Sequence, residues 1–410
     1  MSRSVRGFCL GLACVFAIAC GEAREPTTYV EKTFLVVVNY DIFHDLEPSL
    51  NQYAAALGRR GVEVHIEPWV PPGTFDELRA LVFRYVDEEQ IEGALLVGSL
   101  PAAWYEQEAH GKHEEFPTDI VLQDRDAVWT DADDDDDREV FDAHTPLKID
   151  LYTSRIDGTV EELREYFDRV DYYRHIGPLV DVRAFVFLDD DYSSDYHLKT
   201  QSMYLDQIYE QVLIMREPSD TTIDSYIGVL TAGGAEFVYQ ASHSSSTYLS
   251  IGEGCTCAEL VALDIRASFF NLFNCLAARF TEENLAQAYV MRTGHGLALV
   301  GSTKLGAIRD ARLFHLRLAE GRTWGEAYLD WYNEVGVASD EWHLGIVLMG
   351  DPLLHLHGDT LPRAVALSAD WESPPEDSEF MRELMREIAR TAEPGTFEEY
   401  RAAHPEFFED

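Results

Sequence analysis

The sequence predicts an α/β fold in which helices cover both faces of a parallel sheet. Short apolar runs, such as residues 34–38 (FLVVV), have the continuous hydrophobicity of strands that are buried on both faces. Longer segments alternate with these runs, for example residues 160–174, where Leu163, Tyr166 and Val170 recur at helical spacing. Because β-α-β units place successive strands in parallel, this alternation favours a sheet sandwiched between two helical layers.

Residues 33–175 are predicted to form the first of two α/β subdomains. Its first helix would carry Pro48 in its opening turn and end before Gly61, the positions at which these residue types are favoured. Residues 105–146 interrupt the pattern with a polar, aromatic and acidic insertion that includes five consecutive aspartates. The expected elements are strands at 34–38, 62–66, 94–97 and 147–153, and helices at 47–60, 74–89 and 160–174.

Residues 180–358 are predicted to form the second α/β subdomain, which carries the candidate chemistry. Residues 359–410 are polar and acidic, and we expect a peripheral, partly helical tail there. The expected strands are 184–188, 212–215, 236–241, 268–273, 297–301 and 353–356, and the expected helices are 202–210, 282–292, 310–320 and 323–334.

The N-terminus is typical of an exported bacterial lipoprotein. Two arginines precede an apolar stretch at residues 8–20, which is too short to span a membrane and has the layout of a secretory signal. The stretch ends in AIAC, which resembles a lipobox and would make Cys20 the acylated residue. The sequence therefore predicts a signal peptide at 1–20, a tether at 21–32 and a lipid-anchored location in the cell envelope, at the outer membrane or cell surface. An ordinary cleaved signal peptide is the alternative.

The excess of acidic over basic residues makes some classes of binding partner unfavourable. The 410 residues include 32 basic and 74 acidic side chains, for a formal net charge of −42. Nucleic-acid binding requires a basic footprint, which this composition does not supply, so we expect no nucleic-acid partner. The negative charge would attract basic substrates.

The cysteine count points to a free thiol. Of the six cysteines, three lie in the leader, which leaves Cys255, Cys257 and Cys275 in the body of the chain. An odd number in an exported protein leaves at least one thiol free or paired between chains. A free thiol in an oxidising compartment suggests a chemical role.

Two of the predicted strands end in reactive side chains. His243 follows the strand at 236–241, and Cys275 follows the strand at 268–273. Ligands of open parallel sheets bind beyond the carboxyl ends of the strands, where the two side chains would meet. Cysteine catalysis needs such a thiol and base, and a helix N-terminus expected near Cys275 would lower the pKa of its thiol. A buried core cysteine and a structural histidine are the alternatives.

Five segments in order along the chain resemble the gingipain-like cysteine peptidases of the caspase-like clan. They are LKIDLYTSRID, VYQASHSSS, FFNLFNCLAARF, LALVGSTKLG and GDPLL. The resemblance implies a caspase-like α/β sandwich and a cysteine endopeptidase that hydrolyses protein or peptide substrates, with cleavage after arginine or lysine. It also implies that no cofactor is required for catalysis.

The resemblance also implies roles for individual residues. Cys275 would attack the scissile carbonyl, His243 would serve the leaving group, and the backbone N–H groups of Cys275 and Ser244 would hold the oxyanion. Asp150 aligns with the acidic residue that opens the family's E-x-x-x-G-R-like strand and would orient His243. Ser244 stands where the family has glycine, so an inactive envelope lipoprotein that binds peptides or surface polymers is an alternative. His295, which precedes a strand, is a weaker candidate base.

Two metal sites are compatible with the sequence. Asp131, Asp133, Asp135 and Asp142 alternate as in a calcium-binding loop, although the glycine of such loops is missing. A structural calcium ion and a solvated acidic loop are both open there. A second hypothesis is a zinc-stabilised structural module, because three cysteines and one histidine can complete a zinc site. Its ligands would be Cys255, Cys257, Cys275 and His243.

Overall fold

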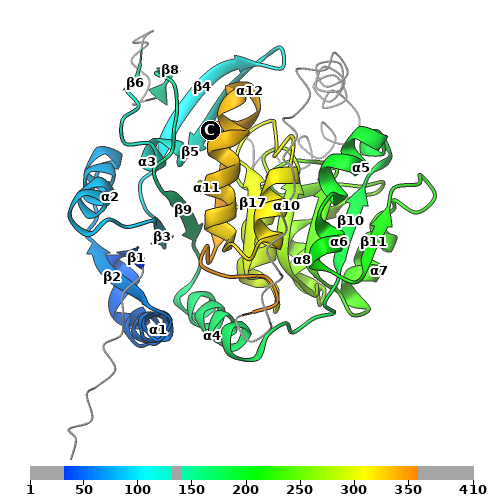
Figure 1. The fold of residues 1–410 in the computed structure, drawn as a ribbon. Helices are drawn as coiled ribbons and strands as arrows, with labels where there is room; N and C mark the ends of the chain where they lie inside the picture. Colours follow the sequence, from blue (N-terminus) through cyan, green and yellow to red (C-terminus); the bar gives the residue numbers. More distant parts are fainter. Residues whose placement is uncertain (1–31, 132–139, 359–410) are drawn as a thin grey trace, which may run out of the picture.

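The computed structural model describes residues 32–131 and 140–358, which form a large sheet with helices on both faces (Figure 1). The predictions made for residues 1–31 and 359–410, Cys20 among them, lie outside the described residues. The α/β class is confirmed. In order across the sheet, the strands are β11 (Val212–Met215), β10 (Ala184–Leu188), β12 (Ala235–Ala241), β16 (Ala267–Phe273), β17 (Ala298–Ser302), β18 (Ile346–Gly350), β9 (Tyr152–Ile156), β3 (Gly93–Val97), β1 (Lys32–Asn39) and β2 (Val62–Trp69).

Strands from both predicted subdomains join in this one ten-stranded sheet. Neighbouring strands within each half are parallel, but β17 and β18 are antiparallel, and β18 pairs in parallel with β9. The two halves therefore run in opposite directions. As a result, the amino end of β9 lies at the same edge of the sheet as the carboxyl ends of β12 and β16.

Recurrent capping boxes define where the main helices begin. In each, a threonine side chain accepts a hydrogen bond from the backbone of a glutamate three residues later, and the glutamate bonds back to the threonine N–H. These boxes start α2 (Phe75–Glu89), α4 (Val160–Ile176), α8 (Cys257–Ala262) and α11 (Trp324–Glu334). The other α-helices of four or more residues in the described part of the chain are α1 (Tyr40–Gly58), α3 (Ile120–Gln123), α5 (Asp195–Ser202), α6 (Leu205–Ile208), α7 (Ile223–Thr231), α10 (Arg312–Ala319) and α12 (Asp340–His343).

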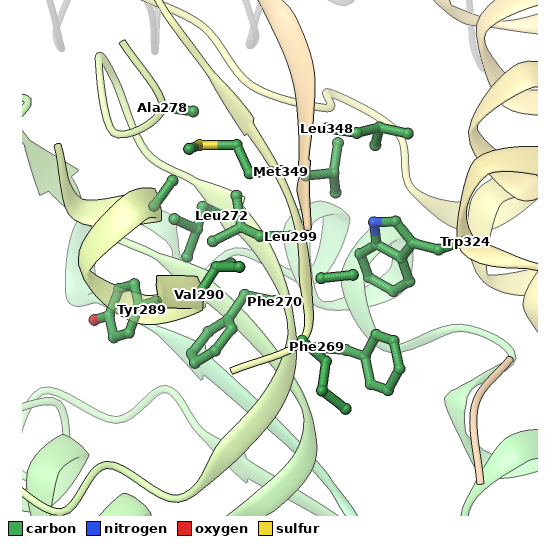
Figure 2. Packing of buried hydrophobic residues seen from close by; sticks show 14 of the residues in the cluster. Phe269, Phe270, Leu272, Ala278, Tyr289, Val290, Leu299, Trp324, Leu348 and Met349 are labelled. Atoms are coloured by element: carbon green, nitrogen blue, oxygen red, sulfur yellow. The ribbon is translucent and has the colours of Figure 1, made fainter. Parts of the chain in front are cut away.

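Alternate residues of the central strands pack into different helical layers (Figure 2). On one face of β16, the ring of Phe269 lies 5.3 Å from that of Trp324 at the start of α11. On the other face, Phe270 stacks on Tyr289 at 4.5 Å, in a π-helical turn at Ala288–Arg292. All four rings are completely buried. This packing fixes β16, and with it the point where the chain leaves the sheet toward Cys275.

The acidic insertion contains strands that the sequence did not predict. Strands β4 (Ala103–Ala109) and β5 (Lys112–Thr118) form a hairpin whose two turn residues, His110 and Gly111, have positive φ values of 55° and 76°. Such paired left-handed residues suit the twist of a two-residue hairpin. Short strands β6 (Trp129–Thr130), β7 (Val140–Phe141) and β8 (Ala143–His144) complete the insertion.

Two predicted elements are absent from the structure, and the strand predicted at 147–153 begins only at Tyr152, as β9. Residues 353–356 form turns and irregular backbone instead of a strand. Gly350 adopts a φ of 95° and Asp351 accepts a hydrogen bond from the N–H of Leu353, which turns the chain after β18. The helix expected at 202–210 is replaced by α5 and α6, which are separated by Tyr204 in the left-handed conformation. Among the residues described, no helix has the length and hydrophobicity to cross a membrane.

Candidate active site

His243 and Cys275 leave two neighbouring strands at equivalent positions. Strands β12 and β16 pair in parallel, with Ala241 opposite Phe273 at their carboxyl ends. Each candidate residue lies two positions beyond this last pair. The sheet therefore brings the two segments to the same edge, although 32 residues separate them in the sequence.

Three polar side chains, those of Gln240, Asn274 and Ser244, join the two strand ends. The buried amide of Asn274 donates to the carbonyl oxygen of Ser242 at 2.7 Å and receives a hydrogen bond from Gln240 at 3.1 Å. The hydroxyl of Ser244 donates to the carbonyl oxygen of Cys275 at 2.5 Å. These bonds restrict the separation of the two candidate residues.

His243 is held between a carboxylate and a phenol. It begins β13 (His243–Ser244), which pairs with β14 (Tyr248–Ser250) and through it with β15 (Cys255–Thr256) in a small antiparallel sheet. Its Nε2 lies 3.1 Å from Oδ2 of Asp191, and its Nδ1 lies 3.2 Å from the hydroxyl of Tyr192. The hydrogen bond from His243 holds the pKa of Asp191 below its ordinary value.

These contacts select one tautomer of the neutral imidazole. An ionised Asp191 can only accept, so Nε2 of His243 donates to it. Nδ1 then carries the lone pair and accepts from the hydroxyl of Tyr192. This is the nitrogen that can take up a proton, while the carboxylate holds the opposite side of the ring.

Tyr192 links the histidine to the cysteine. Its ring lies 5.5 Å from the ring of Phe273. Burial raises the pKa of Tyr192 well above its ordinary value, and the nearby Cys275 makes the second largest contribution to this increase. Both Asp191 and Tyr192 lie in a short 3-10 helix (Asp190–Tyr192) directly after β10. The sequence analysis missed them, although the run LDDDY at the end of a predicted strand was the available signal.

Cys275 is buried, and its thiol has a raised pKa. It is 8% exposed, and burial raises the pKa of its thiol to about 11, while a hydrogen bond from the backbone of Gly306 acts in the opposite direction. The expectation that a helix N-terminus activates this thiol is wrong. The segment after Cys275 consists mainly of turns, and the next helix, α9 (Leu285–Gln287), begins ten residues later.

Asp150 lies at the expected edge of the sheet but belongs to a different part of it. It precedes β9, which is four strand positions from β12, or about 19 Å at ordinary strand spacing. Its exposed carboxylate accepts a hydrogen bond from the N–H of Arg125 at 3.0 Å. The carboxylate that contacts His243 is therefore that of Asp191, and the proposed role of Asp150 is not reflected in its contacts.

His295 lies at the opposite edge. It precedes β17, which runs parallel to β16, so it lies near the amino ends of these strands, away from Cys275. Its nearest charged partner is Asp264, with Nδ1 3.9 Å from Oδ1. The alternative that His295 serves as the base is therefore wrong.

The structure does not support the zinc module. Within residues 32–131 and 140–358, no group of three or more histidine, cysteine or acidic residues could hold a metal ion. All three cysteines are free and buried, and burial raises the pKa of Cys255 to about 11 and that of Cys257 to about 12. The described residues therefore lack the arrangement of a zinc site.

The calcium hypothesis stays a prediction. Asp133 and Asp135 lie outside the described residues, whereas the flanking Asp131 and Asp142 lie within them. The base of the loop is fixed in place, because the N–H of Asp142 donates to Thr130 at 3.1 Å and its carbonyl accepts from Tyr105 at 2.9 Å.

Comparisons with known proteins identify the family. The sequence profile of Peptidase family C25 matches residues 68–357. No curated protein matches the chain. Among solved structures, the leucine binding protein LivK from Thermotoga maritima matches at 12% identity over 52% of this chain and 56% of that chain. Its TM-score of 0.16 is too low to indicate a shared fold. The C25 match spans both candidate residues and most of the described sheet, so the chain belongs to Peptidase family C25, the gingipain family of cysteine peptidases with a caspase-like α/β fold.

Proposed function

We propose that this protein is a cysteine-type endopeptidase, with Cys275 as nucleophile and His243 as acid–base catalyst. The observation that carries the proposal is the pairing of β12 with β16, which brings both residues to one edge of the sheet in a member of a cysteine peptidase family. Substrates would be proteins or peptides, and no cofactor would be required for the reaction.

The proton of the Cys275 thiol would leave as the sulfur attacks. Because the pKa of this thiol is about 11, little thiolate is present at neutral pH, and a base must accept the proton during attack. Nδ1 of His243 would take it in place of its contact with Tyr192, while Asp191 holds Nε2 and stabilises the imidazolium. The imidazolium would then protonate the leaving amine, and water would hydrolyse the thioester.

The oxyanion would be stabilised by the backbone N–H groups of Ser244 and Cys275. The serine in place of the family's glycine is compatible with this role, because its hydroxyl is directed to the carbonyl of Cys275. Specificity for arginine or lysine is supported by the aspartates at the end of β10, among them Asp190 and Asp191, and by the net charge of −42. A positively charged side chain would be attracted to this edge of the sheet.

The test is hydrolysis of a mixed peptide library by the purified protein. Cys275→Ala should abolish turnover, and His243→Ala should cost several orders of magnitude in kcat, because members of a catalytic unit fail together. Cys257→Ala is the matched control, since it removes another buried thiol and should change stability more than rate. Absence of cleavage by a folded wild-type protein whose Cys275 reacts with iodoacetamide would favour the inactive, peptide-binding alternative. That alternative rests on Ser244 in place of the family's glycine, and the raised pKa of the buried Cys275 thiol is compatible with it.

We further propose that Cys20 carries a lipid that anchors the protein to the bacterial envelope, and that the acidic loop binds a structural calcium ion. The first rests on the lipobox-like AIAC and the second on the alternating aspartates, including Asp131 and Asp142. Neither is required for the hydrolytic chemistry.

A further inference from the structure

The loop that follows β17 forms backbone hydrogen bonds with Cys275 and Leu276. Gly306 donates a backbone hydrogen bond to Cys275, and the carbonyl of Lys304 accepts from the N–H of Leu276 at 2.9 Å. Leu276 has a φ of 60°, which is unusual for a branched residue and is maintained only if its surroundings hold it. The position of Cys275 therefore depends on where this loop lies.

A buried ion pair fixes that loop to the insertion hairpin. The side chain of Lys304 is fully buried, and its Nζ lies 2.9 Å from Oε2 of Glu114 on β5. The other carboxylate oxygen of Glu114 accepts from the N–H of Leu305 at 2.9 Å. Lys304 also donates to the carbonyl oxygens of Leu305 and, at 2.7 Å, of Glu341 on α12. One carboxylate thus holds both the side chain and the backbone of the loop.

Glu114 and Lys304 are also two of the charged residues that affect the pKa of the Cys275 thiol. Lys304 and Lys112 act to lower the pKa of Cys275, while Glu114 acts to raise it. Tyr192, which also lies near the thiol, is neutral at physiological pH because its pKa is raised. Burial lowers the pKa of Lys304, and the carboxylate of Glu114 opposes that effect.

We propose that Glu114 and Lys304 are positioning residues for Cys275. The carboxylate of Glu114 anchors the loop that contacts the nucleophile, and its negative charge partly offsets the positive charge by which Lys304 favours ionisation of the thiol. One residue of the acidic insertion, Glu114, would thereby help to position the nucleophile. This inference rests on the proposed role of Cys275 as nucleophile, and it names residues outside the strand-end pair.

The decisive prediction is that two substitutions act in opposite directions. Glu114→Gln keeps an oxygen for the N–H of Leu305 but leaves the lysine charge uncompensated, so the thiol should ionise more readily. Lys304→Met removes the positive charge and leaves the carboxylate of Glu114 without a cation, so the Cys275 thiol should ionise less readily. A nearby charge changes a pKa by about 1 unit or more. Allowing for the lower nucleophilicity of a more acidic thiol, one unit corresponds to roughly a fourfold change in alkylation rate.

The measurement is the rate of iodoacetamide labelling of Cys275 at pH 8, resolved from Cys255 and Cys257 by peptide mass spectrometry. Glu114→Gln should be roughly fourfold faster than wild type and Lys304→Met roughly fourfold slower. Glu108→Gln, on the same hairpin with a side chain that is 77% exposed, is the matched control and should match wild type. Changes of the same sign, or no change beyond this control, would overturn the inference.

A second comparison protects against misfolding, since Lys304→Met leaves a buried carboxylate without its cation. The double variant Lys304→Met/Glu114→Gln carries neither charge and should be labelled more slowly than Glu114→Gln alone. Equal rates would show that the lysine charge does not act on the thiol. Labelling does not require turnover, so opposite shifts without peptide cleavage would reject only the peptidase proposal. Cleavage without opposite shifts would reject only this inference.

Discussion

The hydroxyl of Ser244 donates a hydrogen bond of 2.5 Å to the carbonyl oxygen of Cys275. This bond joins the two chain segments that carry the proposed catalytic pair, beyond the last paired residues of β12 and β16. The residue that replaces the family's glycine therefore has a structural use, since it ties the histidine segment to the nucleophile segment.

Removing this hydroxyl should impair catalysis more than stability. Ser244→Ala deletes one hydrogen bond, which costs about 1 kcal/mol of unfolding free energy. Because the two segments can then separate, we expect kcat/KM to fall roughly tenfold, the equivalent of about 1.4 kcal/mol. Ser245→Ala is the control, because the hydroxyl of Ser245 accepts a hydrogen bond from the N–H of Tyr248 at 3.1 Å, within the connection between β13 and β14, and does not contact the Cys275 segment in this bond. Chemical denaturation and peptide hydrolysis of both variants provide the comparison, and equal kinetic losses would contradict the prediction.

The two candidate carboxylates can be separated by substitution with asparagine. Asp191→Asn keeps the shape but removes the charge that faces Nε2 of His243, so kcat/KM should fall by about tenfold, limited by the 58% exposure of the Asp191 side chain. Asp150→Asn should have a smaller effect, because its carboxylate accepts from Arg125 instead. Steady-state kinetics on one peptide substrate decides between them. A larger loss for Asp150→Asn would restore the role that the family resemblance suggested.

Stability should fall steeply as the solution is acidified below pH 6.5. Burial lowers the pKa of His110 and His315 to about 3 and that of His197 and His343 to about 4. The unfolded chain therefore binds more protons than the folded protein between pH 6.5 and these values. The stability present above pH 6.5 is lost at up to about 1.4 kcal/mol per pH unit for each histidine.

The variant His315→Leu tests this account. It removes one such group, so the unfolding free energy should depend less steeply on pH between pH 4.5 and 6, by about one proton. His113→Gln is the control, because the His113 side chain is 58% exposed. Urea unfolding at several pH values measures the slope, and an unchanged slope for His315→Leu would exclude a contribution from this residue.

Acylation of Cys20 can be tested in cells. Labelled fatty acid should be incorporated into the wild-type protein and be lost in Cys20→Ala, because the proposed lipid is attached to the residue at this position. The control is Cys14→Ala, which removes another leader cysteine and should keep the label. Equal labelling of wild type and Cys20→Ala would rule out an anchor at this position.

Calcium should raise the melting temperature if the acidic loop binds it. A ligand that binds only the folded state stabilises it, by about 2.7 kcal/mol at a concentration one hundred times its Kd. Asp131→Asn combined with Asp142→Asn should abolish the increase. An unchanged melting temperature in excess calcium and in chelator, with no bound metal detected by mass spectrometry, would reject the site.

The sequence by itself determined the alternation of strands and helices, and with it the positions of His243 and Cys275. Continuous apolar runs such as those at 184–188 and 212–215 correspond to strands with the same bounds in the structure. The first strand is buried on both faces, as its pattern predicts, whereas the second is a partly exposed edge strand. The placement of both residues after strands of a parallel sheet follows from the same local pattern. The partial match of five short segments also sufficed to indicate the family.

Only the tertiary structure decided which side chains surround these two residues. Asp191, Lys304 and Glu114 come from a strand end, a loop and an inserted hairpin. The run LDDDY places Asp191 at a strand end, but the local sequence does not show which of these side chains lie near His243 or Cys275. The reversal between β17 and β18 determines which chain ends share an edge of the sheet. The pKa of the Cys275 thiol likewise depends on its burial. These properties arise from contacts between residues far apart in the chain, which local hydrophobic patterns do not encode.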